Sequence, residues 1–110
     1  MSRRHDQWLE DIVEAAAAIR SHLQRGTLSD GLVFDAVRLR LIEIGEAVER
    51  ISPEVLATEP DIPWEDVAGM RDGLAHRYFD TSHAIVEATV DHDLPVLEAG
   101  VLRLRARWAT

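Results

Sequence analysis

Apolar residues recur every three or four positions along most of this chain, which is the spacing of one face of an α-helix. The first such run begins at Trp8 and stops before Gly26, a residue type that commonly ends helices. A second and longer run extends from Phe34 to Ile51, where Ser52-Pro53 closes it. The pattern therefore predicts two helices over these ranges, and the second is the more regular.

The remainder of the chain predicts shorter helices. Residues 53–62 are expected to form a short turn of helix and a loop, and Pro63 suits the first position of a third helix. Asp80-Thr81-Ser82 is expected to break that helix and to cap a fourth one around residues 84–90. A fifth helix is expected to begin near Pro95.

No segment sustains the alternation of apolar and polar residues that a half-buried strand requires. The pattern therefore predicts an all-α fold, an antiparallel bundle of four to five helices with short connections. No repeat, linker or change in composition divides the chain, so one domain over residues 1–110 is expected.

Composition narrows the possible functions. A chain of 110 residues suits one core, near the size at which a partner subunit adds stability. It has no cysteine, which excludes disulfides and thiol nucleophiles. Its net charge of −8 opposes general attraction to nucleic acid, so any RNA contact must be local. Neither a signal peptide nor a membrane-spanning run is recognisable, which predicts a soluble, cytoplasmic protein with no membrane partner.

The stretch RDGLAHRY, which begins at Arg71, concentrates reactive side chains in the third predicted helix. Arg71, Asp72, His76 and Tyr78 are expected on one side of that helix. Asp72 lies one turn before His76, so its carboxylate can orient an imidazole that exchanges protons near neutral pH. Arg71 adds a permanent cation suited to a phosphate. This set fits metal-free RNA cleavage, in which the histidine moves protons and the arginine stabilises the phosphorane.

Gly69 and Gly73 stand one turn apart in the same predicted helix, although each costs a helix about 1 kcal/mol relative to alanine. Together they form a bare strip that admits a second helix or a substrate backbone. One histidine cannot easily act as both general base and general acid. The strip therefore predicts a two-fold homodimer that brings two copies of the motif together.

The same residues also permit an ordinary structural interpretation. Arg71 with Asp72 could be a surface ion pair, His76 an interfacial histidine with satisfied hydrogen bonds, and Tyr78 part of a cap over the core. Residue chemistry alone leaves both interpretations open.

A family resemblance favours the catalytic interpretation. The run Arg-x4-His-x-Tyr formed by Arg71, His76 and Tyr78 resembles the signature of the HEPN ribonuclease superfamily, and specifically of HepT toxins, the former DUF86 family. RLRLIEIGEAVERIS (38–52) and IPWEDVAGMRDGLAHRYF (62–79) are similar to family segments and stand in the same order. The resemblance covers almost the whole chain.

This resemblance implies an all-α dimer with a composite site, metal-independent RNA cleavage and toxicity to the host cell. It implies catalytic roles for Arg71 and His76, with Asp72 as the supporting polar residue. It also implies an antitoxin of the MntA type, a minimal nucleotidyltransferase that transfers AMP from ATP to Tyr78. The alternative is a non-catalytic HEPN-like module that only docks on a nucleotidyltransferase, although the intact Arg71 and His76 favour the enzyme. No cofactor is expected, because no glycine-rich phosphate loop precedes a helix.

Three residues outside the motif allow further predictions. Gly45 in the middle of the second helix suggests close packing, and Glu46 beside it either hydrogen-bonds into the site or is an ordinary solvated glutamate. Trp64 either stacks on bases or packs at the start of the third helix, and packing is favoured.

The other arginines and histidines give weaker signals. Arg103, Arg105 and Arg107 either form an RNA-backbone patch or simply suit the C-terminal end of a helix, and their spacing favours the second interpretation. The scattered histidines form no paired ligand motif, so no metal site is expected.

Overall fold

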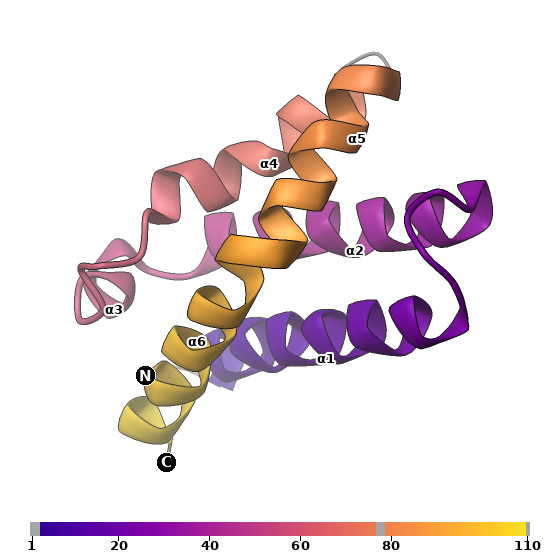
Figure 1. Cartoon of the computed structure of the whole chain (residues 1–110). Coiled ribbons are helices and arrows are strands. Elements are labelled where there is room, and N and C mark those ends of the chain that lie inside the picture. Colours follow the sequence, from indigo (N-terminus) through magenta and orange to yellow (C-terminus); the bar gives the residue numbers. More distant parts are fainter. Residues whose placement is uncertain (1–2, 77–78, 110) are drawn as a thin grey trace.

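The computed structural model describes the backbone of residues 3–76 and 79–109 and the side chains of residues 5–74 and 83–109. Every regular element in these ranges is a helix (Figure 1). In chain order the elements are α1 (Arg3–Arg25), α2 (Gly31–Arg50), α3 (Pro53–Leu56), α4 (Trp64–His76), α5 (Phe79–Ala88), the π-helical η1 (Thr89–Asp93) and α6 (Leu94–Trp108). The predicted all-α helical fold is confirmed.

The first two helices form an antiparallel pair (Figure 1). The side chain of Asp30 caps α2 by accepting the backbone N–H of Leu32 at 2.9 Å, which satisfies one of the free donors of the first turn. At the other end Ile51 leaves the helix in an extended conformation, and Ser52 caps the short α3. These local signals set the length of α2, the helix against which α4 packs.

The helix α4 packs directly against the backbone of α2 at Gly45. A Cβ atom at Gly45 would lie 3.0 Å from the carbonyl oxygen of Val67 and 3.2 Å from that of Ala68. Any larger residue would push the two backbones apart, because carbonyl oxygens cannot move aside as flexible side chains do. The predicted close packing at Gly45 is confirmed.

The predicted break at Asp80-Thr81-Ser82 is wrong. These residues belong to the first turn of α5, which begins at Phe79. Aspartate, threonine and serine are favourable in the first helical turn as well as before it, because the positive end of the helix dipole and its free N–H groups lie there. The sequence signal was genuine, but it marks the start of the helix rather than a gap.

The predicted fourth and fifth helices are also not separate. The stretch η1 joins α5 to α6 without a loop, and the Leu94 N–H donates to the carbonyl of Thr89, five residues back. A wider π-helical turn at this point accommodates Pro95, which has no N–H for an ordinary helical bond. The resulting rod crosses the α1–α2 pair (Figure 1).

The core draws apolar side chains from all the longer helices. The largest fully buried side chains are Phe34, Leu9, Ile12, Ile19, Leu41, Ile44, Leu74, Leu104, Val37, Val86 and Val101. Among the described residues, no helix combines the length and apolarity needed to cross a bilayer.

Candidate functional site

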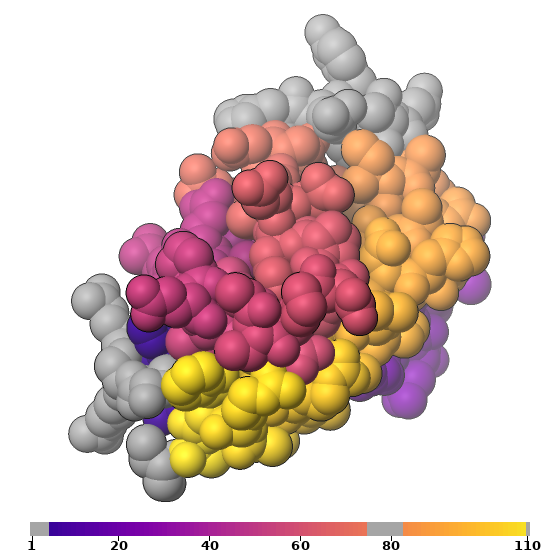
Figure 2. All heavy atoms as spheres, turned by 90° about the vertical axis from the view of Figure 1, so that its left-hand side faces the viewer, coloured from indigo at the N-terminus to yellow at the C-terminus, as the bar shows by residue number. Residues whose placement is uncertain are grey.

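The helix α4, which carries the motif, lies at the surface with α3 on one side and α5 on the other (Figure 2). Gly69 is exposed, and a Cβ atom at this position would meet nothing within 4 Å among the described residues, apart from its chain neighbours and the backbone of its own helix. Gly73, one turn further on, is half-buried. The predicted strip is therefore open to a partner at Gly69.

The guanidinium of Arg71 lies between two carboxylates. Its Nη1 is 3.6 Å from Oε2 of Glu49 in α2, and its Nε and Nη2 are each 3.4 Å from Oδ1 of Asp72. The side chains of Arg71 and Glu49 are both 41% exposed, and that of Asp72 is 70% exposed. Long contacts between solvated groups are weak, so a phosphate with short, charge-assisted hydrogen bonds can replace them.

Of the remaining two motif residues, the structure describes only the backbone of His76. His76 is the last residue of α4, and its side chain lies outside the described residues. Tyr78 lies outside them entirely. By helical register, position 76 falls within about 60° of Gly69 and Asp72, whereas Arg71 is about 160° round the helix from Gly69. Asp72 lies between these two directions, about 100° from Arg71 and about 40° from position 76. It contacts Arg71 and stands one turn before position 76.

The glutamate of α2 that reaches Arg71 is Glu49, not Glu46. Glu46 turns to the opposite side and lines a hollow against α1 together with Trp8. Glu49 stands one turn after Gly45, which touches α4, so both occupy the same face of α2. That spacing from the packing glycine is the sequence signal that could have identified Glu49.

Arg38 is a second α2 residue that sequence reasoning missed. Its Nε donates to the carbonyl oxygen of Leu74 at 3.1 Å. This carbonyl is one of the last four of α4, which have no partner within the helix. Arg38 therefore caps the helix that ends at His76, where a cation also suits the negative end of the dipole.

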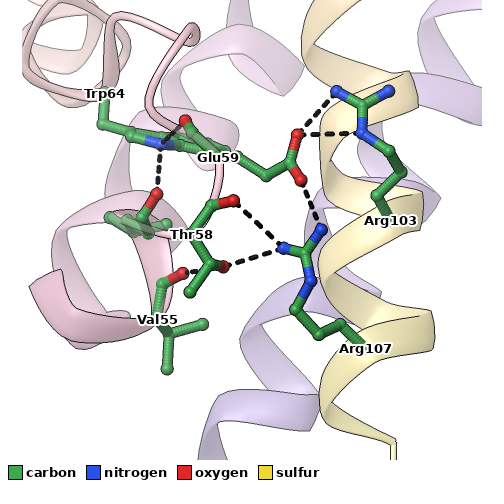
Figure 3. A network of polar contacts seen from close by, with 7 residues as sticks. Val55, Thr58, Glu59, Trp64, Arg103 and Arg107 are labelled. Carbon is green, nitrogen blue, oxygen red and sulfur yellow. Dashed lines mark hydrogen bonds and ion pairs between the residues drawn. The ribbon is translucent and has the colours of Figure 1, made fainter.

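Trp64 is held by the loop that precedes α4 (Figure 3). Its indole Nε1 donates to the carbonyl oxygens of Leu56 at 2.9 Å and Glu59 at 3.0 Å. The ring also packs against the core. The prediction that Trp64 packs at the start of this helix is confirmed.

The C-terminal arginines are paired with carboxylates. Arg103 and Arg107 converge on Glu59, with contacts of 2.6 Å and 2.8 Å (Figure 3). Arg105 lies 3.0 Å from Glu10. Glu59 is only 10% exposed. The hydrogen bonds from Arg103 and then Arg107 lower the pKa of Glu59, against the opposing effect of burial. The network joins the α3–α4 loop to α6, which indicates a structural role rather than an RNA-binding patch.

His83 also has packing contacts. Its ring stacks on Phe34 with the ring centroids 5.1 Å apart, and its Nε2 lies 3.1 Å from the carbonyl oxygen of Leu28. Among the described side chains, no group of three or more histidine, aspartate or glutamate residues could hold a metal ion.

Known proteins match most of the chain, including the segment that carries the motif. The family described as "Ribonuclease HepT-like" matches residues 9–104. The chain is 34% identical over 109 residues to "Probable ribonuclease HepT" of Thermococcus cleftensis, covering 96% of this chain and 99% of the relative. It is 26% identical over 106 residues to a "Putative RNase" of Methanocaldococcus jannaschii, covering 92% and 97%. No solved structure gives a significant match. With most of its length matched in both comparisons, the chain belongs to the HepT-like ribonuclease family.

Proposed function

We propose that this chain is an endoribonuclease toxin that cleaves RNA without a metal ion, using Arg71 and His76 with support from Asp72. Membership of the HepT-like ribonuclease family supports the substrate and the reaction. The observation that carries the assignment of the site is the Arg71 guanidinium, held at the surface between Glu49 and Asp72. A cation in this position offers forked N–H donors to a phosphate.

The proposed reaction uses the RNA's own hydroxyl as nucleophile. A histidine takes the proton of the ribose 2′-hydroxyl, and the oxygen attacks the neighbouring phosphorus. Arg71 stabilises the charge of the resulting phosphorane. The bond from phosphorus to the 5′-oxygen then breaks, and a protonated histidine gives that oxygen its proton. The products are a 2′,3′-cyclic phosphate and a 5′-hydroxyl, and DNA, which lacks the 2′-hydroxyl, is not cut.

The two proton transfers support a homodimer. One chain supplies one His76, so a partner copy would supply the second imidazole. The open space at Gly69, on the same line of α4 as position 76, leaves room for that copy.

The proposal includes control by a nucleotidyltransferase of the MntA type. AMP attached to Tyr78 would carry a phosphodiester anion two residues beyond His76. That anion would compete with the RNA phosphate for Arg71, and the adenosine would occupy space needed by RNA. Inhibition would follow from imitation of the substrate.

The test compares Arg71→Ala and His76→Ala with Arg40→Ala as the control. In the wild type, the guanidinium of Arg40 pairs with Glu43 on the same helix at 3.1 Å. Each motif variant should cut a model RNA at least about 100-fold more slowly, since a proton-transfer or charge-stabilising group is lost. The Arg40 variant should cut normally, and EDTA should leave the wild-type rate unchanged. Cleavage that survives His76→Ala, or that chelation abolishes and added metal restores, would contradict this mechanism.

A further inference from the structure

Arg38 carries a charge that no carboxylate among the described side chains neutralises. Its Nε is bonded to the Leu74 carbonyl, but its two Nη groups have no hydrogen bond or ion pair within the described part of the chain. Arg71, Arg103 and Arg107 all lie within 4.0 Å of a carboxylate. Arg25 and Arg50 also have no carboxylate within ion-pair distance among the described residues, but Arg38 differs from them because it lies beside the motif, bonded to the Leu74 carbonyl. Capping α4 uses only its Nε, which leaves the charge of its Nη groups available to a ligand.

The position of Arg38 follows from the geometry of α2. Arg38 and Glu49 are eleven residues apart, which places them about 20° apart on the helix and on the same line facing α4. Glu49 contacts Arg71, whereas Arg38 contacts Leu74 three residues further along α4. The two side chains thus bracket the segment from Arg71 to Leu74, and α4 ends at His76, two residues beyond.

We propose that Arg38 is a second phosphate-binding residue of the RNA site, holding a phosphate adjacent to the scissile one through its Nη groups. This inference rests on the proposed ribonuclease function. A guanidinium has five N–H donors in a rigid plane, and the Leu74 carbonyl engages only the one on Nε. Because that bond fixes the plane in advance, phosphate binding costs less side-chain entropy than it would for a free arginine.

Salt dependence separates this role from that of a simple helix cap. A cation that neutralises one phosphate of a single strand adds about 0.7 to the slope of log affinity against log salt concentration. A residue that only caps α4 changes the stability of the fold but not the number of counterions released by RNA. The slope is therefore the measurement that decides between the two roles.

The experiment measures binding of a fluorescein-labelled, single-stranded 2′-O-methyl oligoribonucleotide by anisotropy over a series of potassium chloride concentrations. Methylation blocks the attacking hydroxyl, so binding is seen without cleavage. Arg38→Ala should weaken binding about tenfold and reduce the slope by about 0.7. Arg38→Lys should keep the slope because it keeps the charge. Arg40→Ala is the matched control on the same helix and should match the wild type.

A slope for Arg38→Ala equal to that of the wild type would overturn the inference. If that variant does not fold, Arg38→Gln decides instead, because its amide can still donate to Leu74 while its charge is gone. Wild-type protein that binds the methylated RNA with an Arg38-dependent slope but never cuts the unmodified strand would refute the nuclease and leave Arg38 as an RNA contact. Wild-type protein that binds neither RNA would refute both.

Discussion

The guanidinium of Arg71 in α4 lies 3.6 Å from the carboxylate of Glu49 in α2, so an ion pair joins the two helices beside their contact at Gly45. An exposed pair of this length contributes only about 0–1 kcal/mol to folding. Its larger effect is on the cation itself, which Glu49 both restrains and partly neutralises. RNA that uses Arg71 must therefore compete with Glu49.

Replacing Glu49 should strengthen RNA binding but slow the chemical step. Glu49→Gln removes a negative charge from the phosphate site, so KM for RNA should fall. It also releases the Arg71 side chain, so kcat should fall, by about threefold to tenfold if roughly 1 kcal/mol of positioning is lost. Steady-state cleavage of a fluorogenic RNA measures both. Glu46→Gln is the control, because Glu46 lies on the α1 side of the same helix, and equal effects of the two variants would contradict this role of Glu49.

Two glycines should respond oppositely to the same substitution. Gly45→Ala forces a methyl group against backbone carbonyls of α4 and should destabilise the fold by about 1–3 kcal/mol. Gly69→Ala meets nothing within 4 Å and should stabilise the helix of the free chain by up to about 1 kcal/mol. Urea unfolding at equal protein concentration compares them. A Gly45→Ala chain as stable as the wild type would mean that α4 does not pack on α2 as described.

The helices were largely predictable because most of them bury one apolar face. The apolar run of the second helix was taken from Phe34, whereas α2 begins at Gly31. Its first turn combines an exposed Leu32 with a buried Val33, so apolar spacing alone did not mark where the helix begins. The misplaced break at residues 80–82 has a different cause. Cap-forming residues suit both the position before a helix and its first turn, and the sequence alone does not separate these cases.

The site was less predictable than the fold. The motif drew attention to Arg71 and Asp72, which do contact each other. Glu49 and Arg38 were missed because their importance depends on how α2 crosses α4, and apolar spacing does not specify which polar residues reach across such a contact. The partner of Arg38 is a backbone carbonyl, which no side-chain motif can reveal.

The Glu59 network should make folding sensitive to acid. Arg103 and Arg107 hold the pKa of Glu59 below its ordinary value in the folded chain. The stabilisation is therefore complete above the unfolded-state pKa and is lost as the pH falls through the folded-state pKa. The difference in unfolding free energy between wild type and Glu59→Gln should be largest at neutral pH and should shrink in acid. A difference that is constant from neutral to acidic pH would show that the charge on Glu59 contributes nothing.

Tyr78 should be required for inactivation but not for cleavage. Phenylalanine at this position keeps the ring and removes the oxygen to which AMP would be attached. Tyr78→Phe should therefore cut RNA at a rate close to that of wild type and should escape covalent inactivation when expressed with a MntA-type nucleotidyltransferase. Peptide mass mapping of the co-expressed wild-type chain should find one or more AMP units on Tyr78. An unmodified Tyr78 in a fully neutralised complex would mean that the partner inhibits by docking alone.

Dimerisation can be tested at the open side of α4. A tryptophan at Gly69 should leave the fold of one chain intact, because an added Cβ there meets open space among the described residues, but it should block a partner from approaching along the same line. Light scattering should show a wild-type dimer and a monomeric Gly69→Trp chain with far slower RNA cleavage. Leu32→Trp is the control, since Leu32 is exposed on α2.

A mixture of two inactive chains tests whether the sites are shared. A mixed dimer of Arg71→Ala and His76→Ala chains retains one arginine and one histidine across its interface. If Arg71 of one chain acts with His76 of the other, the mixture should cut RNA faster than either parent alone, but more slowly than the wild type because only one of the two imidazoles remains. Sites confined to single chains predict no gain on mixing. A wild-type monomer at micromolar concentration that cuts RNA at full rate would remove the need for a second histidine, and the two proton transfers would then have to be assigned to one imidazole acting in turn.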